Sequence, residues 1–244
     1  MVESTNSWRD ELLVDSNFKL DISYNYELLI SLLNEVTGDI DNINPYKLCL
    51  MLQQITKPFK TLSSAMSKMG EKIGERVTEI RTVFNKYDDS SSTLQQCLEN
   101  ELQIGVNGLT GENNKKSGYG KDSKYYQYIS VACACNRLIF FLNFVKTIFH
   151  YFNTTSNGTD KCMKLAFEDT LGKVFGWLKK KAFGVALSFV SSKRDEFYLA
   201  FLGDKTISDD STAKINELGE KIALFQEYLQ KYISSNGLTI ELEF

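Results

Sequence analysis

The chain has 244 residues, enough for one large domain or two small ones with a sizeable core. Its 28 basic and 31 acidic residues give a net charge of −3, which excludes the basic excess typical of general nucleic-acid binders. The only prolines are Pro45 and Pro58, and long proline-free stretches favour helices because proline disrupts helix interiors. We therefore expect an all-helical protein that does not bind nucleic acid.

Helical periodicity predicts most of the regular structure in chain order. Residues 1–20 are polar and are expected to form an N-terminal segment ahead of a single domain over residues 21–244. Apolar residues spaced by three and four predict helices, and stretches rich in Gly, Ser, Asn and Asp predict loops. The expected helices are 25–37, a segment after Pro45 with Pro58 as a candidate bend, 62–86, 92–104, 123–152, 160–190, a short helix ending at Gly203, and 208–235. The expected loops are 88–92, 105–122 and 153–159, and the last residues are expected to be extended.

The five cysteines favour an intracellular protein. None belongs to a C-x-x-C pair and their number is odd, so we expect reduced, buried thiols rather than disulfides or metal ligands. The chain opens without a basic and apolar leader, which favours a cytoplasmic location. The most apolar run, residues 138–149, is too short for a membrane span and contains Asn143 and Lys146.

Catalytic motifs are scarce, so we do not expect an enzyme. His150 is the only histidine, which removes most histidine-based catalytic and metal sites. No glycine-rich loop has the spacing of a phosphate-binding P-loop. A thiol enzyme would need a base beside a cysteine, and the sequence identifies none. We expect no catalytic residue, no metal and no cofactor.

Several segments resemble the glycolipid transfer protein family in order and spacing. They are "VTEIRTVF" (77–84), "TLQQCLENE" (93–101), "LNFVKTIF" (142–149), "FGWLKKKAFGVAL" (175–187) and "KRDEFYLAFLG" (193–203). The resemblance implies an all-α, two-layer sandwich of about eight helices. It also implies a surface site for a lipid headgroup and a hydrophobic pocket for the acyl chains between the layers. Proteins of this family carry lipid between membranes without chemistry.

The resemblance also implies where a headgroup would bind. Glycolipid-binding members have an Asp, an Asn four residues later and a Lys three further on, and these positions are Lys72, Arg76 and Glu79 here. The family's sugar-stacking Trp is Arg137, and the family's His is Phe175. The branch that carries ceramide phosphate resembles this chain more closely, with Arg at the Trp position and Lys at the Asn position. The expected headgroup site is therefore Lys72, Arg76, Arg137 and Phe175.

These replacements favour an anionic headgroup over a neutral sugar. Arginine and lysine suit phosphate, and arginine can bind it through two parallel hydrogen bonds. Lys72 cannot accept the hydrogen bond that the family's Asp takes from the ceramide amide. The alternative is that Lys72, Arg76 and Glu79 form an exposed stripe of ion pairs, with Glu79 neutralising part of the site. Arg137 favours the anion site, because an arginine on an apolar helix face usually has an anionic partner.

The segment around the second tryptophan suggests a membrane-contacting surface. The family's matching Trp and its neighbours contact the membrane, and Trp177, Leu178, Lys181 and Phe183 fit that role by resemblance. A Trp ring settles at the bilayer interface, and lysines attract anionic lipid headgroups. The alternative is that Trp177 belongs to the core and the lysines form a solvated face.

Apolar residues on the long helices are candidates for the acyl-chain pocket. They are Phe140, Phe144, Phe149, Leu171 and Leu187, with Phe183, Phe189, Leu62, Met66 and Ile80 nearby. A plain helical core would have the same residues at the same spacing.

We expect a cytoplasmic, monomeric, non-enzymatic lipid transfer protein that contacts membranes peripherally. Its expected cargo is a phosphate-bearing sphingolipid or related lipid rather than a neutral glycolipid. The alternative is a degenerate module of the same fold that docks on membranes or proteins without transferring lipid.

Overall fold

The computed structural model describes residues 23–87, 91–203 and 206–241. Over these ranges the regular structure is helical, apart from one antiparallel bridge between Thr110 and Ile129. The all-α prediction is therefore confirmed. The polar N-terminal segment expected at 1–20 lies outside the described residues.

Ten helices follow one another in the described residues. They are α2 (Tyr26–Gly38), α3 (Pro45–Leu62), α4 (Ser64–Lys86), α5 (Leu94–Gln103), α6 (Val131–Thr154), α7 (Thr159–Asp169), α8 (Leu171–Val174), α9 (Trp177–Leu187), α10 (Arg194–Leu202) and α11 (Ser211–Ser235). Side-chain caps begin several of them: Asn25, Ser63, Thr93 and Ser130 each accept a backbone N–H of the first turn of α2, α4, α5 and α6. Helix α3 continues through Pro58, and α10 ends before Gly203 as predicted.

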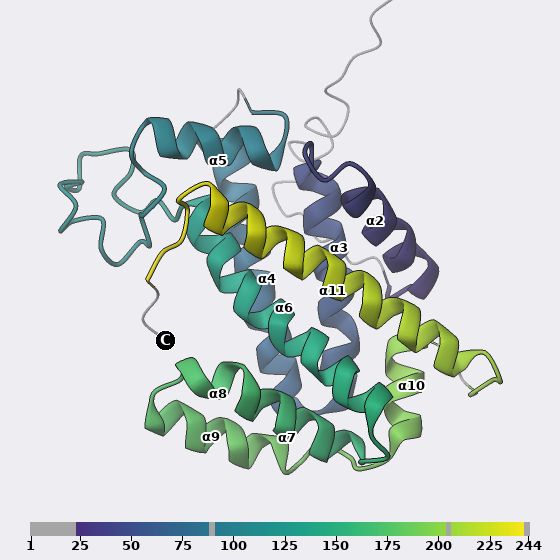
Figure 1. Cartoon of the computed structure of the whole chain (residues 1–244). Coiled ribbons are helices and arrows are strands. Elements are labelled where there is room, and N and C mark those ends of the chain that lie inside the picture. Colours follow the sequence, from purple (N-terminus) through teal and green to yellow (C-terminus); the bar gives the residue numbers. More distant parts are fainter. Residues whose placement is uncertain (1–22, 88–90, 204–205, 242–244) are drawn as a thin grey trace, which may run out of the picture.

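The helices form two layers around one core (Figure 1). Helices α6 and α11 run side by side across α3 and α4, and α2 packs against α3 and α11. The two helices of the front layer approach closely, since a Cβ at Gly219 of α11 would lie 2.9 Å from the Cβ of Phe149 on α6. Helices α7, α8 and α9 cover one edge of the sandwich, and α10 packs against α3 and α11.

Helix α6 is the central element of the fold. It contacts α4, α5, α7, α8 and α11, and most of its side chains are buried. Among the described residues, it is the only helix long and apolar enough to cross a membrane, yet 67% of its most apolar window is buried inside the protein. Its length and composition therefore fit the core helix of a sandwich.

Two of the predicted boundaries are wrong. The helix expected from residue 123 begins at Val131, because residues 123–130 form turns that lead to the Ser130 cap. The single helix expected over 160–190 is three helices, α7, α8 and α9. A Cβ at Gly172 would lie 2.8 Å from the carbonyl oxygen of Phe167, so a glycine is needed where the chain turns tightly after α7.

Candidate functional site

A group of three charged side chains joins α4 to α6. The Nη2 atom of Arg76 lies 2.9 Å from the Oε1 atom of Glu79, one turn further along α4. The Nη1 atom of Arg137 on α6 lies 3.6 Å from the same oxygen. The side chains of Arg76 and Glu79 are only 14% and 12% exposed, so the two arginines converge on a largely buried carboxylate. We call Arg76, Glu79 and Arg137 the buried charged triad.

Two polar atoms of the buried charged triad have no hydrogen-bond partner among the residues that the structure describes. They are the Nε atom of Arg76, which is a donor, and the Oε2 atom of Glu79, which is an acceptor. Burial raises the pKa of the Glu79 carboxyl, whereas Arg76 and Arg137 act in the opposite direction. A buried polar atom without a partner is unfavourable, so the triad has unused capacity to bind a polar group.

Lys72, which was expected in the same site, lies outside the triad. Its side chain is 74% exposed, and its Nζ atom is 2.6 Å from the Oε1 atom of Glu75. The other carboxylate oxygen of Glu75 lies 2.9 Å from Nη2 of Arg76. The alternative of an exposed ion-pair stripe therefore describes Lys72 and Glu75, but not Arg76 and Glu79.

Phe175 and Phe183 belong to an aromatic cluster at the edge of the sandwich. The ring of Phe183 on α9 stacks on Phe167 of α7 at 4.5 Å between centroids and meets Phe144 of α6 edge-on at 6.2 Å. Phe175, at the end of α8, has its ring 5.8 Å from Phe167 and 6.2 Å from Phe183. We call Phe144, Phe167, Phe175 and Phe183 the edge cluster. Phe183 was expected both at the membrane and beside the acyl-chain pocket, and its half-buried ring packs against Phe144 and Phe167.

The residues expected to line an acyl-chain pocket lie on two sides of α6. Phe144 belongs to the edge cluster, and Leu171 and Leu187 are buried on α8 and α9 at the same edge. Phe149 instead packs against Phe197 and Phe201 of α10, with centroids 5.4 and 5.1 Å apart. Phe140 is half-buried against the core, where Met66 and Ile80 are also found.

Helix α9 exposes large apolar side chains. Trp177 is 75% exposed and Leu178 is 70% exposed, so the alternative in which Trp177 is a core residue is wrong. Val185 lies further along the same helix and is also exposed. Phe189 was expected in the pocket, but it is 73% exposed just beyond the helix. Lys181 places its ammonium 5.6 Å from the centroid of the Trp177 ring, as in a cation–π contact.

Comparison with known proteins identifies the family. The family model for glycolipid transfer protein matches residues 43–203, which is more than half of the chain. The chain belongs to the glycolipid transfer protein family. No curated protein sequence matches it, so the remaining comparisons concern solved structures.

Several solved structures share the fold of this glycolipid transfer protein family member. Mouse ceramide-1-phosphate transfer protein has a TM-score of 0.70 at 15% identity, covering 88% of this chain and 98% of its own. The human ceramide-1-phosphate transfer protein, solved with a short-chain ceramide 1-phosphate, has a TM-score of 0.71 at 12% identity, covering 88% and 97%. The fungal glycolipid transfer protein HET-C2 has a TM-score of 0.61 at 16% identity, covering 81% and 89%. Identities this low establish the common fold.

Family members are lipid transfer proteins rather than enzymes, and the thiols of this one are poorly suited to catalysis. All five cysteines are buried, and none forms a disulfide. Burial raises the pKa of Cys133, one turn before Arg137, to about 11, and that of Cys49 to about 12. Such thiols stay protonated at neutral pH and are weak nucleophiles. In the part of the chain that the structure describes, no three His, Cys, Asp or Glu side chains gather as a metal site would require.

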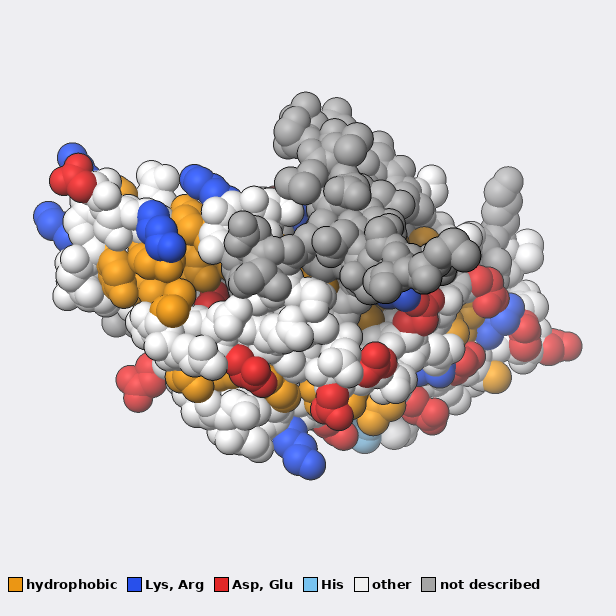
Figure 2. All heavy atoms as spheres, turned by 90° about the horizontal axis from the view of Figure 1, so that it is seen from above, with side chains coloured by type: hydrophobic (Ala, Val, Ile, Leu, Met, Phe, Trp, Pro, Cys, Tyr) orange, Lys and Arg blue, Asp and Glu red, His pale blue; other side chains and the backbone are white. Residues whose placement is uncertain are grey.

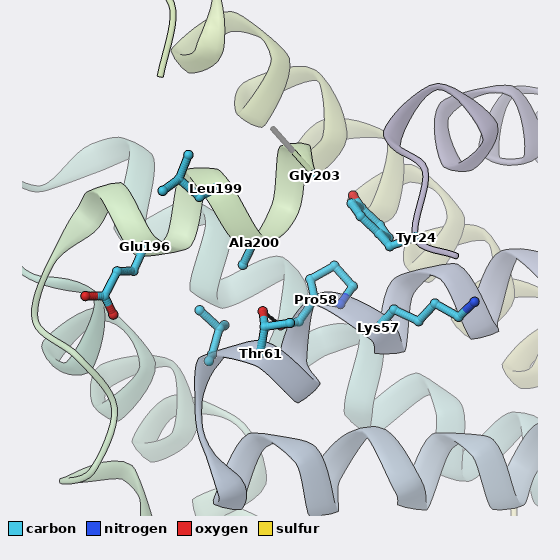
Figure 3. A pocket seen from close by; sticks show the side chains of 9 residues that line it. Tyr24, Lys57, Pro58, Thr61, Glu196, Leu199, Ala200 and Gly203 are labelled. Atoms are coloured by element: carbon cyan, nitrogen blue, oxygen red, sulfur yellow. Dashed lines mark hydrogen bonds between the residues drawn. The ribbon is translucent and has the colours of Figure 1, made fainter. Parts of the chain in front are cut away.

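Two surface features of this family member were not singled out by sequence. A pocket of about 460 Å³ lies between α3 and α10, where Pro58, Thr61 and Ala200 face one another and Lys57 and Glu196 point outward at opposite ends (Figure 3). Leu62, expected in the acyl-chain pocket, lines this surface pocket instead. Figure 2 shows apolar side chains bordered by lysine or arginine on the side of the molecule that carries the loop between α5 and α6. Leu102 and Ile104, at the end of α5 and just before this loop, are exposed. Neither feature could be seen as a pattern, since each combines residues from segments that are irregular or distant in sequence.

Proposed function

We propose that this member of the glycolipid transfer protein family carries a lipid with a phosphate-bearing headgroup between membranes, without chemical change. The observation that carries the proposal is the convergence of Arg76 and Arg137, from two helices, on one largely buried spot. A guanidinium held in low dielectric binds phosphate strongly and with defined geometry. Solved structures of the same fold that hold ceramide 1-phosphate, from human and Arabidopsis, support a related cargo.

The acyl chains enter at the edge cluster, between α6 and the α7–α9 edge. This region combines Phe144 and Phe183 with Leu171 and Leu187. Phe183 and Leu187 lie on α9, the same helix that exposes Trp177 and Leu178. Phe183 and Phe175 are only half-buried, so the cluster reaches the surface where a chain could be admitted. Chains would enter by displacing these rings, since the side chains of the cluster pack against one another.

Helix α9 docks on the membrane during transfer. The exposed Trp177, Leu178, Val185 and Phe189 supply apolar area, and Lys179, Lys180 and Lys181 supply positive charge. These are the components of an interfacial anchor on an anionic leaflet. Peripheral contact, a cytoplasmic location, a monomeric state and a single domain over residues 21–244 complete the proposal. The buried cysteines form no disulfide, which supports a reducing compartment.

Transfer of fluorescent lipids between vesicles tests this function. The assay compares ceramide phosphate with galactosylceramide for the wild type, Arg137→Leu and the matched control Lys72→Leu, which removes the same charge from an exposed side chain. We expect Arg137→Leu to slow transfer of the phosphate-bearing lipid by at least tenfold, because one charge-assisted contact is worth about 1.5–3 kcal/mol. Lys72→Leu should change it by less than about threefold.

Two other outcomes of the transfer assay would contradict parts of the proposed function. Galactosylceramide transfer that is unaffected by Arg137→Leu would refute the headgroup assignment while leaving the family intact. Vesicle binding without transfer of any lipid would favour a docking module. That second function is supported by the dense packing at the expected pocket, where Phe144 and Phe149 are both fully buried.

A further inference from the structure

Glu79 occupies a position where a phosphate site would be expected to hold a cation or a neutral group. Its Oε1 atom forms ion pairs with both Arg76 and Arg137. Its Oε2 atom is buried and has no hydrogen-bond partner within the described ranges of the chain. The buried Nε donor of Arg76 likewise has no partner in the described part of the chain. The triad therefore has one donor, Nε of Arg76, and one acceptor, Oε2 of Glu79, that a ligand could satisfy. A ligand that satisfies both must present an acceptor and a donor close together.

The net charge of the triad further limits which headgroup can bind there. Two arginines and one carboxylate give the triad a net charge of +1, and the exposed Lys72–Glu75 pair adds nothing to it. A phosphate monoester carries roughly −1.5 to −2 at neutral pH, and it would lie beside the Glu79 carboxylate. A phosphodiester carries −1, which matches the triad and reduces that repulsion.

We infer that the cargo has a phosphodiester headgroup whose outer part carries hydrogen-bond donors, either an ammonium or hydroxyl groups. Arg76 and Arg137 bind the phosphate oxygens, and Glu79 Oε2 accepts a hydrogen bond from the outer group. Glu79 is then the residue that selects among phosphate-bearing lipids. This inference rests on the proposed function, because it assumes that the triad receives the headgroup of a transferred lipid.

The alternative role for Glu79 is purely internal, as a carboxylate that neutralises two arginines. That role accounts for Oε1, which both guanidinium groups reach. It does not account for Oε2, which lies buried on the same carboxylate with no donor from the described residues, nor for Nε of Arg76. A carboxylate that served only the arginines would be expected to take a separate donor on each oxygen.

A panel of lipids with one ceramide and different headgroups tests the inference. The panel contains ceramide phosphate, ceramide phosphoethanolamine, ceramide phosphoinositol and sphingomyelin, each transferred between vesicles by the full-length protein. Sphingomyelin is the matched control, because its quaternary ammonium keeps the phosphodiester but has no N–H donor. We expect the wild type to transfer at least one donor-bearing lipid about tenfold faster than both sphingomyelin and ceramide phosphate. The phosphoethanolamine and phosphoinositol arms show whether the donor is an ammonium or a hydroxyl.

Glu79→Gln tests the residue, with Glu71→Gln as a control that makes the same charge change at an exposed position of α4. Glu79→Gln should reduce the preference to about twofold or less and raise ceramide phosphate transfer, whereas Glu71→Gln should leave the ratios unchanged. Should Glu79→Gln fail to fold, the wild-type ratio of donor-bearing lipid to sphingomyelin decides the question alone. Equal transfer of all phosphodiesters, or fastest transfer of ceramide phosphate, overturns the inference but leaves the proposed function standing. Absence of transfer for every phosphate-bearing lipid overturns the proposed function itself.

Discussion

At the scale of single residues, Glu101 organises the start of the central helix. Its carboxylate is buried at the end of α5, where it accepts the phenol hydrogen of Tyr128 and the backbone N–H groups of Val131 and Ala132. A negative charge at the first turn of a helix satisfies unpaired N–H groups and interacts favourably with the helix dipole. Glu101 therefore fixes the position of α6, and with it Arg137, relative to α5.

Replacing this carboxylate should destabilise the fold. Glu101→Gln is expected to lower the free energy of unfolding by about 2–4 kcal/mol, because three buried donors lose a charged acceptor and the new amide presents donors of its own. Urea unfolding followed by circular dichroism measures the change. Glu99→Gln, at an exposed position of the same helix, should stay within about 0.5 kcal/mol. Similar losses in the two variants would contradict the role given to Glu101.

The sequence predicts some residues of the buried charged triad, but it does not predict the contacts that join different helices or the burial of Glu101. Arg76 and Arg137 could be placed by resemblance, and Glu79 could be expected to pair with Arg76. Its second partner, Arg137, belongs to a different helix, so local spacing could not show that contact. Glu101 lies in a short amphipathic helix, where a glutamate usually indicates a solvated face. Its burial depends on the loop that follows, which carries no periodic signal.

At the scale of elements, α9 shows that an unbroken apolar periodicity can cover more than one helix. The apolar pattern continues across residues 160–190, so it predicts one helix, but Gly172 and the Gly176 cap divide it. The division turns α9 into a separate helix at the edge of the sandwich. It also exposes side chains that the unbroken pattern would place in the core, including Phe189. The membrane-contacting role of Trp177 and Leu178 remains a prediction, and their exposure is what makes it testable.

A pair of exposed leucines provides that test. Leu178→Glu should weaken binding to anionic vesicles by at least tenfold, because it removes about 1.5–3 kcal/mol of apolar burial and adds a charge that the leaflet repels. Leu224→Glu makes the same change on α11, where the leucine is also exposed, and should alter binding by less than twofold. Vesicle sedimentation at two salt concentrations measures both, and the wild-type affinity should fall as salt rises. Equal effects of the two substitutions would place membrane contact elsewhere than α9.

At the scale of the whole molecule, composition and proline scarcity correctly indicate an all-helical protein. The family resemblance predicts the two-layer arrangement, whereas periodicity does not. The faces of α6 could not be resolved from sequence, because this helix is apolar nearly all round and no single stripe marks its inner side. The sequence therefore assigns Phe144 and Phe149 to one pocket, although the fold directs Phe144 toward α9 and Phe149 toward α10.

This division predicts different consequences for two chemically identical substitutions. Phe144→Leu and Phe149→Leu each remove aromatic volume from a fully buried position of α6, so both should lower stability by a similar amount of about 1–2 kcal/mol. Only Phe144→Leu enlarges the edge cluster where we propose that acyl chains enter. It should raise transfer of an 18-carbon acyl lipid relative to an 8-carbon analogue with the same headgroup by roughly threefold, while Phe149→Leu leaves that ratio unchanged. Vesicle transfer of the two analogues measures the ratio for each variant. If only Phe149→Leu changes the transfer ratio, the acyl chains enter on the α10 side of α6. If both substitutions change the ratio, the two sides of α6 do not act separately on acyl-chain entry.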